Sequence, residues 1–210
     1  MTKIKEKFEQ KLLVEGKDDQ HVIWALCQQF GVKESFDVID CEGFNNLFEQ
    51  IPQRLKQSGI KTLGIIVDAD TDINARWQSI KNSVSLYGFI VSDRLPPEGL
   101  IFENAEGIKI GVWVMPNNET NGMLEDFIAF LVPEKDQLLP IADNVLNDIE
   151  KQKLEKYLPV HQSKARIHTW LAWQDEPGSP LGQSITKRYL STDNHSCSLL
   201  IDWLKRLFAA

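Results

Sequence analysis

The sequence lacks any apolar run of the roughly 18 to 20 residues that a membrane-spanning helix requires. Its first ten residues, MTKIKEKFEQ, are rich in charge and contain no apolar segment of the kind found in signal peptides. We therefore expect a cytoplasmic protein with no membrane partner.

Cysteine is scarce as well. The three cysteines, Cys27, Cys41 and Cys197, lie far apart and form neither a CxxC pair nor a Cys/His zinc pattern. This usage predicts reduced thiols within the core rather than disulfides or a zinc site.

An excess of positive charge is also missing. The chain has 23 Lys and Arg against 30 Asp and Glu, a formal net charge of −7, which argues against broad, non-specific binding to a phosphate backbone. Nucleic acid stays open as a partner, because acids that hold Mg²⁺ contribute to this sum and a local basic patch is compatible with it. With 210 residues, 42% of them hydrophobic, the chain can form one sizeable core, or one domain and an appendage.

Strand-like and helix-like segments alternate in the first half of the chain. Short apolar runs at 10–15, 36–41, 62–68 and 108–115 have strand character, and helical periodicity occupies 22–30, 44–55 and 73–87. Pro52 predicts a kink or a split in the second helical segment. This alternation predicts an α/β fold with a doubly wound, mainly parallel four-stranded sheet whose first three strands are neighbours.

The region from Ser92 to Gly107 is predicted as a long loop or as an inserted hairpin at Leu100–Glu103. After this region and the fourth strand, the sequence has helical periodicity at 123–131, 136–158, 164–173 and 196–208. We expect an α/β core over residues 1–132 and a helical C-terminal extension over 133–210, packed on that core.

Carboxylates stand where two of the predicted strands end. The run Ile65-Ile66-Val67 stops at Asp68-Ala69-Asp70-Thr71-Asp72, and Glu15 ends the first run in the same way. The carboxyl ends of parallel strands are where such sheets bind ligands. If the first and third strands are adjacent, Glu15 and Asp68 lie side by side and Asp70 can turn back toward them. Crowded carboxylates repel one another, so this edge predicts a Mg²⁺ or Mn²⁺ site.

Other acidic residues could serve either as metal ligands or as charges at helix N-termini. Glu125 and Asp126 either approach the same edge and hold a second cation, or are charges at a helix N-terminus. Asp72 is either a helix cap or a ligand, whereas Asp18 and Asp19 are interpreted mainly as capping residues.

Gly16 follows Glu15 directly, and a glycine at this position allows a tight turn and close approach of a phosphate to the backbone. Other motifs do not match: an EF-hand beginning at Asp68 would need Gly and Glu where the chain has Ile73 and Ser79.

Leu13-Val14-Glu15-Gly16, followed by Val67-Asp68-Ala69-Asp70, resembles the Toprim domain of topoisomerases, DnaG-type primases, OLD-family nucleases and ribosomal-RNA maturases. The resemblance covers about the first 130 residues. It implies that Glu15, Asp68 and Asp70 hold the catalytic Mg²⁺ and that a Toprim-like fold surrounds them.

The whole chain also resembles a standalone Toprim-like family of unknown function, through Met115-Pro116-Asn117-Asn118, the segment 122–127 and the segment 164–174. Topoisomerases and primases use additional domains, so the nearest layout is that of OLD-like nucleases. In these nucleases a lysine assists the chemistry, and Lys164 is the best match for it.

The helix around Lys164 also carries Arg166, His168, Trp170 and Trp173. These residues either contact phosphates and bases, or belong to a helix whose core face is formed by residues 167, 170 and 171, and for the tryptophans we favour the core.

Together these features predict a Mg²⁺-dependent phosphodiester hydrolase that acts on DNA or RNA. Two alternatives are a catalytically silent module that binds a protein partner or a second copy, and an enzyme acting on nucleotides or small phosphates.

Overall fold

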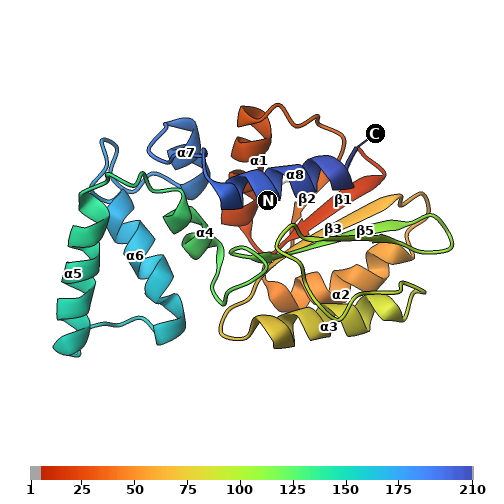
Figure 1. Cartoon of the computed structure of the whole chain (residues 1–210), viewed down its shortest axis with the longest axis horizontal. Coiled ribbons are helices and arrows are strands. Elements are labelled where there is room, and N and C mark those ends of the chain that lie inside the picture. Colours follow the sequence, from red (N-terminus) through yellow and green to blue (C-terminus); the bar gives the residue numbers. More distant parts are fainter. Residues whose placement is uncertain (1–5, 210) are drawn as a thin grey trace.

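The computed structural model describes residues 6–209, which form an α/β fold around one five-stranded sheet (Figure 1). The strands are β1 (Gln10–Val14), β2 (Asp37–Asp40), β3 (Thr62–Asp68), β4 (Leu100–Glu103) and β5 (Lys109–Met115). Their order across the sheet is β2-β1-β3-β5-β4. All neighbouring pairs are parallel except β4 and β5.

The predicted adjacency of the first three strands is confirmed, because β1 lies between β2 and β3. The predicted number of strands is wrong: β4 adds a fifth, which pairs antiparallel with β5 from Leu100↔Val112 to Glu103↔Lys109. This strand has only four residues, none of them fully buried, so its apolar signal in the sequence is weak.

Helices cover both faces of the sheet. On one face lie α1 (Lys17–Gln29), α7 (Leu181–Thr186) and α8 (His195–Leu207), and on the other lie α2 (Phe44–Leu55) and α3 (Ile73–Ser85) (Figure 1). Strand alternation explains the two cores, since Ile66 of β3 joins the first cluster while Ile65 and Val67 join the second. Pro52 does not split α2, which runs through it as one helix.

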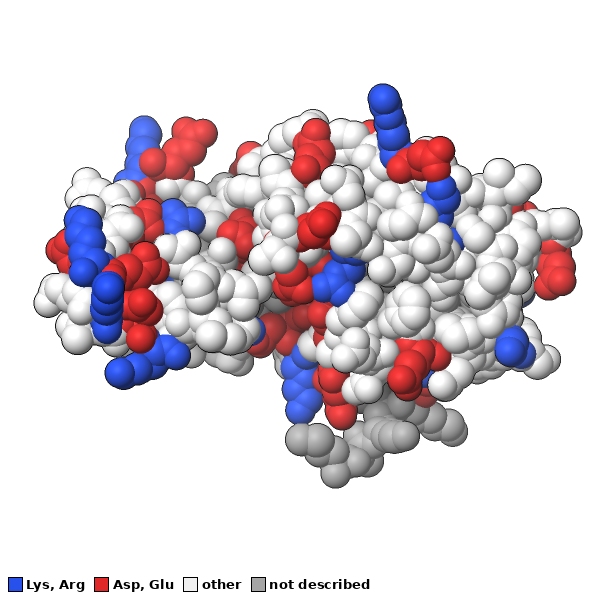
Figure 2. Space-filling view, turned by 90° about the horizontal axis from the view of Figure 1, so that it is seen from below, with Lys and Arg blue, Asp and Glu red and all other residues white. Residues whose placement is uncertain are grey.

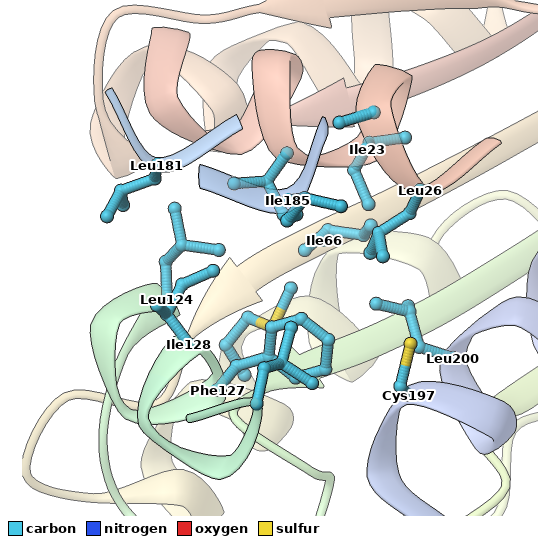
Figure 3. Packing of buried hydrophobic residues seen from close by; sticks show 14 of the residues in the cluster. Ile23, Leu26, Ile66, Leu124, Phe127, Ile128, Leu181, Ile185, Cys197 and Leu200 are labelled. Atoms are coloured by element: carbon cyan, nitrogen blue, oxygen red, sulfur yellow. The ribbon is translucent and has the colours of Figure 1, made fainter. Parts of the chain in front are cut away.

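The first core extends beyond the sheet and its covering helices. Side chains of α1, β3, α7 and α8 meet those of α4 (Leu124–Phe130), as Figure 3 shows for Ile23, Ile66, Phe127, Ile185 and Leu200. Helix α4 therefore docks against the carboxyl end of β3 and is positioned by the same core as the sheet.

Two further helices, α5 (Leu138–Lys151) and α6 (Gln162–Leu171), pack on each other to one side of the sheet, joined by the short 3₁₀ helix η1 (Pro159–His161) (Figure 1). Helix α5 ends before the predicted residue 158. Lys153 adopts a left-handed conformation (φ 55°), and the Leu154 N–H donates to the Ile149 carbonyl at 3.0 Å, as in a Schellman C-cap.

Helix α8 brings the C-terminal part of the chain back onto the sheet. Gly64 of β3 and Gly111 of β5 are neighbours in register, and both lie beneath the end of this helix. A Cβ on Gly111 would stand 2.8 Å from Leu207 Cδ1, and one on Gly64 would stand 3.0 Å from Phe208 Cζ. These glycines permit close packing of the helix on the sheet. In the described residues no helix is both long and apolar enough to span a bilayer.

Candidate metal centre

Glu15 and Asp68 meet at the carboxyl edge of the sheet, as the order of β1 and β3 requires. Glu15 directly follows β1, and its Oε1 accepts a hydrogen bond from the Asp68 backbone N–H at 2.8 Å. Asp68 closes β3, and its Oδ1 accepts from the Leu124 N–H at 2.9 Å, at the start of α4. The two carboxylates are thus fixed to the ends of adjacent strands.

Asp70 is held by the loop that follows β5. Its N–H donates to the Gly122 carbonyl at 2.8 Å, and the Gly122 N–H donates back to the Asp70 carbonyl at 2.9 Å. Asp70 itself is left-handed, with φ 51°, a conformation that aspartate tolerates better than most residues. Its carboxylate forms an ion pair with the Arg76 guanidinium of α3.

The structure brings Asp19 of α1 into the same group. Asp19 is only 7% exposed, and its Oδ2 accepts from the Gly16 N–H at 3.1 Å, so it does cap the helix as expected. The charge of Glu15 acts on the pKa of Asp19, and the charge of Asp19 acts on the pKa of Asp68. Asp19 is therefore both a capping residue and a member of the acidic group.

Glu125 and Asp126 have different surroundings. Glu125 is 3% exposed, and its Oε1 lies 3.3 Å from Lys164 Nζ, so the proposed lysine reaches the acidic group through this ion pair. Asp126 is directed elsewhere: its Oδ2 accepts from the Met123 N–H at 2.8 Å and its Oδ1 from the Ser163 hydroxyl at 2.5 Å. The charge of Glu125 contributes to the raised pKa of Asp68, after burial and the charges of Asp19 and Glu15.

The remaining candidates, Asp72, Asp18 and Gly16, lie at or near the N-terminal ends of α3 and α1. Asp72 caps α3 by accepting from the Ala75 N–H at 2.9 Å, and Asp18 is exposed. Gly16 lies in the bend between β1 and α1, and its φ of −145° and ψ of −179° are extended, a conformation open to any residue. A Cβ at Gly16 would be in ordinary contact with Asp19.

Burial and mutual repulsion raise the pKa values of these carboxyls. Burial, then the charge of Glu15, raises the pKa of Asp19 to about 7. Burial, followed by the charges of Asp19 and Glu15, raises the pKa of Asp68 well above its usual range. Burial also raises the pKa of Glu15, against the opposing effect of the hydrogen bond from the Asp68 N–H. The ionised forms of these carboxyls are therefore disfavoured by burial and by one another, and the protein groups around them do not fully offset this.

Two cations border this negative charge. Burial opposes the charged form of Lys164, but the Glu125 carboxylate outweighs it, with smaller effects of Asp18 and Asp68, and raises the pKa of the lysine. On the other side, the charge of Arg76 favours ionised Glu15. Figure 2 shows acidic side chains gathered in the hollow between the part that contains α5 and α6 and the larger part of the molecule.

These residues fit a hard divalent cation in their chemistry. In the side-chain positions of residues 6–209, no three His, Cys, Asp or Glu residues converge closely enough to hold one ion. Yet the group offers only carboxylate oxygens, which Mg²⁺ and Mn²⁺ prefer, and burial together with the neighbouring carboxylates raises the pKa values of Asp19 and Asp68. The charge of Asp70 acts on Glu15 and Asp68, and its carboxylate is paired with Arg76, so a cation held by these acids would compete with Arg76 for it.

The basic and aromatic residues in and just after α6 mainly make contacts within the protein. Trp170 is 1% exposed and donates from Nε1 to Asp136 Oδ1 at 3.1 Å, and the predicted core face of residues 167, 170 and 171 is buried. Arg166 forms a two-fold contact with Asp143, at 2.5 and 2.9 Å. His168 and Trp173 are exposed.

The three cysteines form no disulfide, and their thiols have raised pKa values. Burial raises the pKa of Cys27 to about 11 and those of Cys41 and Cys197 to about 12. Thiols with such values are protonated at neutral pH and make poor nucleophiles.

Comparison with known proteins gives one match. The family model described as "Protein of unknown function (DUF3226)" matches residues 9–209, which include all the acids above and Lys164. No curated protein and no solved structure matches the chain.

Proposed function

The chain belongs to the family described as proteins of unknown function (DUF3226), and we propose that it is a divalent-cation-dependent phosphodiester hydrolase acting on nucleic acid. One observation carries the proposal: four mutually repelling acids, Glu15, Asp19, Asp68 and Glu125, occupy the carboxyl edge of β1 and β3. Burying like charges together is costly, so such a group is expected where a cation is used.

We further propose that the fold is Toprim-like and nearest in layout to OLD-like nucleases. The glutamate after β1 and the Asp-x-Asp at the end of β3, on strands that are neighbours, support this relation. The ion pair between Lys164 and Glu125 supports a role for the lysine at this site.

Glu15, Asp68 and Asp70 would hold Mg²⁺ or Mn²⁺, with Asp19 and Glu125 as the acids nearest to a second ion. When bound, such an ion polarises the phosphoryl oxygen and makes a water molecule more acidic. We assign no ligand role to Asp126, whose two oxygens are used by Met123 and Ser163.

The protein groups contribute orientation, charge and proton transfer. Glu15 Oε1 is occupied by the Asp68 N–H, which leaves Oε2 to accept a proton if this residue serves as general base. Lys164 is half-exposed beside Glu125, so its ammonium can reach a non-bridging phosphate oxygen while it stays close to the acids.

A cleavage assay tests the proposal. Single-stranded, duplex and structured DNA and RNA are incubated with the protein and Mg²⁺ or Mn²⁺, with chelator as a blank. We expect cleavage that needs the ion and falls at least 100-fold in Asp68→Asn. Asp72→Asn is the matched control, because this aspartate caps α3 outside the group, and it should retain activity.

The outcomes separate the alternatives. Cleavage that survives in both Asp68→Asn and the chelator blank refutes the proposal. Turnover of mononucleotides in preference to polymers favours the enzyme of nucleotides or small phosphates. No turnover of any substrate, together with retained partner binding in the acid variants, favours the silent module.

A further inference from the structure

Arg76 stands between Asp70 and the ring of Phe44. Its side chain is 13% exposed, its Nη2 pairs with Asp70 Oδ2, and its guanidinium carbon lies 3.6 Å from the centroid of the Phe44 ring. In the part of the chain that the structure describes, this is the only carboxylate that the guanidinium contacts. The stack holds the guanidinium plane in place independently of the ion pair.

This guanidinium lies at the border of the acidic group. Its charge acts on Glu15, and its partner Asp70 is one of the acids proposed to hold the cation, with a charge that already acts on Glu15 and Asp68. The backbone of Asp70 is pinned to Gly122 on both sides, so only the carboxylate can change partner. Arg76 and a cation therefore compete for the same carboxylate.

Once a cation takes the Asp70 carboxylate, the guanidinium is left largely buried and held against Phe44 without an anion. An unpaired buried charge is costly, so a new anionic partner becomes favourable at this position. Arginine presents a planar fork of N–H groups that matches two oxygens of a phosphate. A phosphodiester that approaches the cation would bring its non-bridging oxygens to this border.

We propose that Arg76 is a phosphate-binding residue that Asp70 masks until a divalent cation takes the carboxylate. This inference rests on the proposed cation-dependent function and names how its substrate is held. Cation and phosphodiester then promote each other's binding, because each removes a competitor of the other, and such a coupling is reciprocal.

The test measures two binding steps by calorimetry. The first is Mg²⁺ alone. The second is a dinucleotide in saturating Mg²⁺, with the bridging oxygen of its linkage replaced by methylene so that it keeps the charged oxygens and resists cleavage. In Arg76→Gln we expect Mg²⁺ alone to bind about 3- to 10-fold tighter, since an ion pair no longer competes. The dinucleotide should bind at least 10-fold weaker.

Two variants test the reasoning from other sides. Phe44→Leu keeps the ion pair and removes the stack, so it should weaken dinucleotide binding and leave the Mg²⁺ affinity unchanged. Lys81→Gln is the matched control: Lys81 lies on the same helix as Arg76 but pairs with Asp93 in the loop after it, so its removal should alter neither step. Arg76→Lys, which keeps a charge without the fork, replaces Arg76→Gln if the latter does not fold, with the same direction expected for the dinucleotide.

Tighter Mg²⁺ binding together with weaker dinucleotide binding in Arg76→Gln supports the proposal that Asp70 masks this arginine. If Arg76→Gln weakens both steps, the arginine is only structural and the inference is overturned. An unchanged dinucleotide affinity overturns it as well, and leaves the proposed function intact. If the wild-type protein binds no Mg²⁺, the cation site itself fails and this inference fails with it.

Discussion

Removing the negative charge of Asp19 should stabilise the metal-free protein, and the gain should depend on pH. The variant is Asp19→Asn, whose amide oxygen can still accept from the Gly16 N–H and so keep the cap. The change therefore removes the buried charge with little effect on the helix.

The magnitude follows from the pKa of Asp19. Burial and Glu15 raise it to about 7 in the folded chain, against a usual value of 3.8. An acid whose pKa is raised on folding binds more protons in the folded state, so stability falls as the pH rises between these two values. At 1.36 kcal/mol per pKa unit, the full effect is roughly 4 kcal/mol, and because neighbouring acids share it we expect ~2–4 kcal/mol.

The assay is chemical denaturation in the presence of chelator at pH 4 and at pH 8. Asp19→Asn should be ~2–4 kcal/mol more stable than the wild type at pH 8, and close to the wild type at pH 4. Asp18→Asn is the control, since this neighbour is exposed and its loss should cost no more than ~1 kcal/mol at either pH. An equal effect of Asp19→Asn at both pH values would refute the reasoning.

Two further predictions concern the fold. Gly111→Ala should destabilise the protein by ~1–3 kcal/mol in thermal or chemical denaturation, because the new methyl group meets Leu207. The control, Gly16→Ala, should change the stability by less than ~1 kcal/mol, because a Cβ there has only ordinary contacts. Equal effects of the two substitutions would contradict the packing described. Burial opposes the charge of Asp37, but its hydrogen bonds from Lys11 and from the N–H groups of residues 7 and 8 outweigh burial and lower its pKa. Asp37→Asn should therefore cost ~1–3 kcal/mol at pH 7, and the cost should shrink as the pH falls below about 4 through the folded pKa. A cost that is constant from pH 7 to pH 3 would contradict this.

The sequence predicts those parts of the fold that repeat. β1, β3 and β5 are nearly continuous apolar runs because both of their faces are buried, so their periodicity is plain. β4 is short and half-exposed, and helix α7 has only six residues after a Pro-Gly-Ser-Pro breaker. Neither element is long enough for its hydrophobic periodicity to predict both the element and the neighbour on which it packs.

The same contrast holds for the site. Glu15 and Asp68 follow from strand ends and strand order alone. A capping role alone does not describe Asp19, because it precedes Val22, Ile23 and Leu26 at i+3, i+4 and i+7, which places it on the buried stripe of α1. That spacing could have identified it.

Other contacts depend on tertiary packing. The pairing of Arg76 with Asp70, and the different directions of Glu125 and Asp126, follow from how α3, α4 and α6 dock. No local pattern in the sequence encodes those contacts.

The central claim is that the acids at the ends of β1 and β3 hold a divalent cation. A calorimetric titration of the chelator-treated protein with Mg²⁺ and Mn²⁺ at pH 8 tests it most directly. We predict saturable binding in the wild type, a loss of at least 10-fold in affinity in Asp68→Asn, and unchanged affinity in Asp126→Asn. Binding that is absent in the wild type, or equal in wild type and Asp68→Asn, would contradict the account.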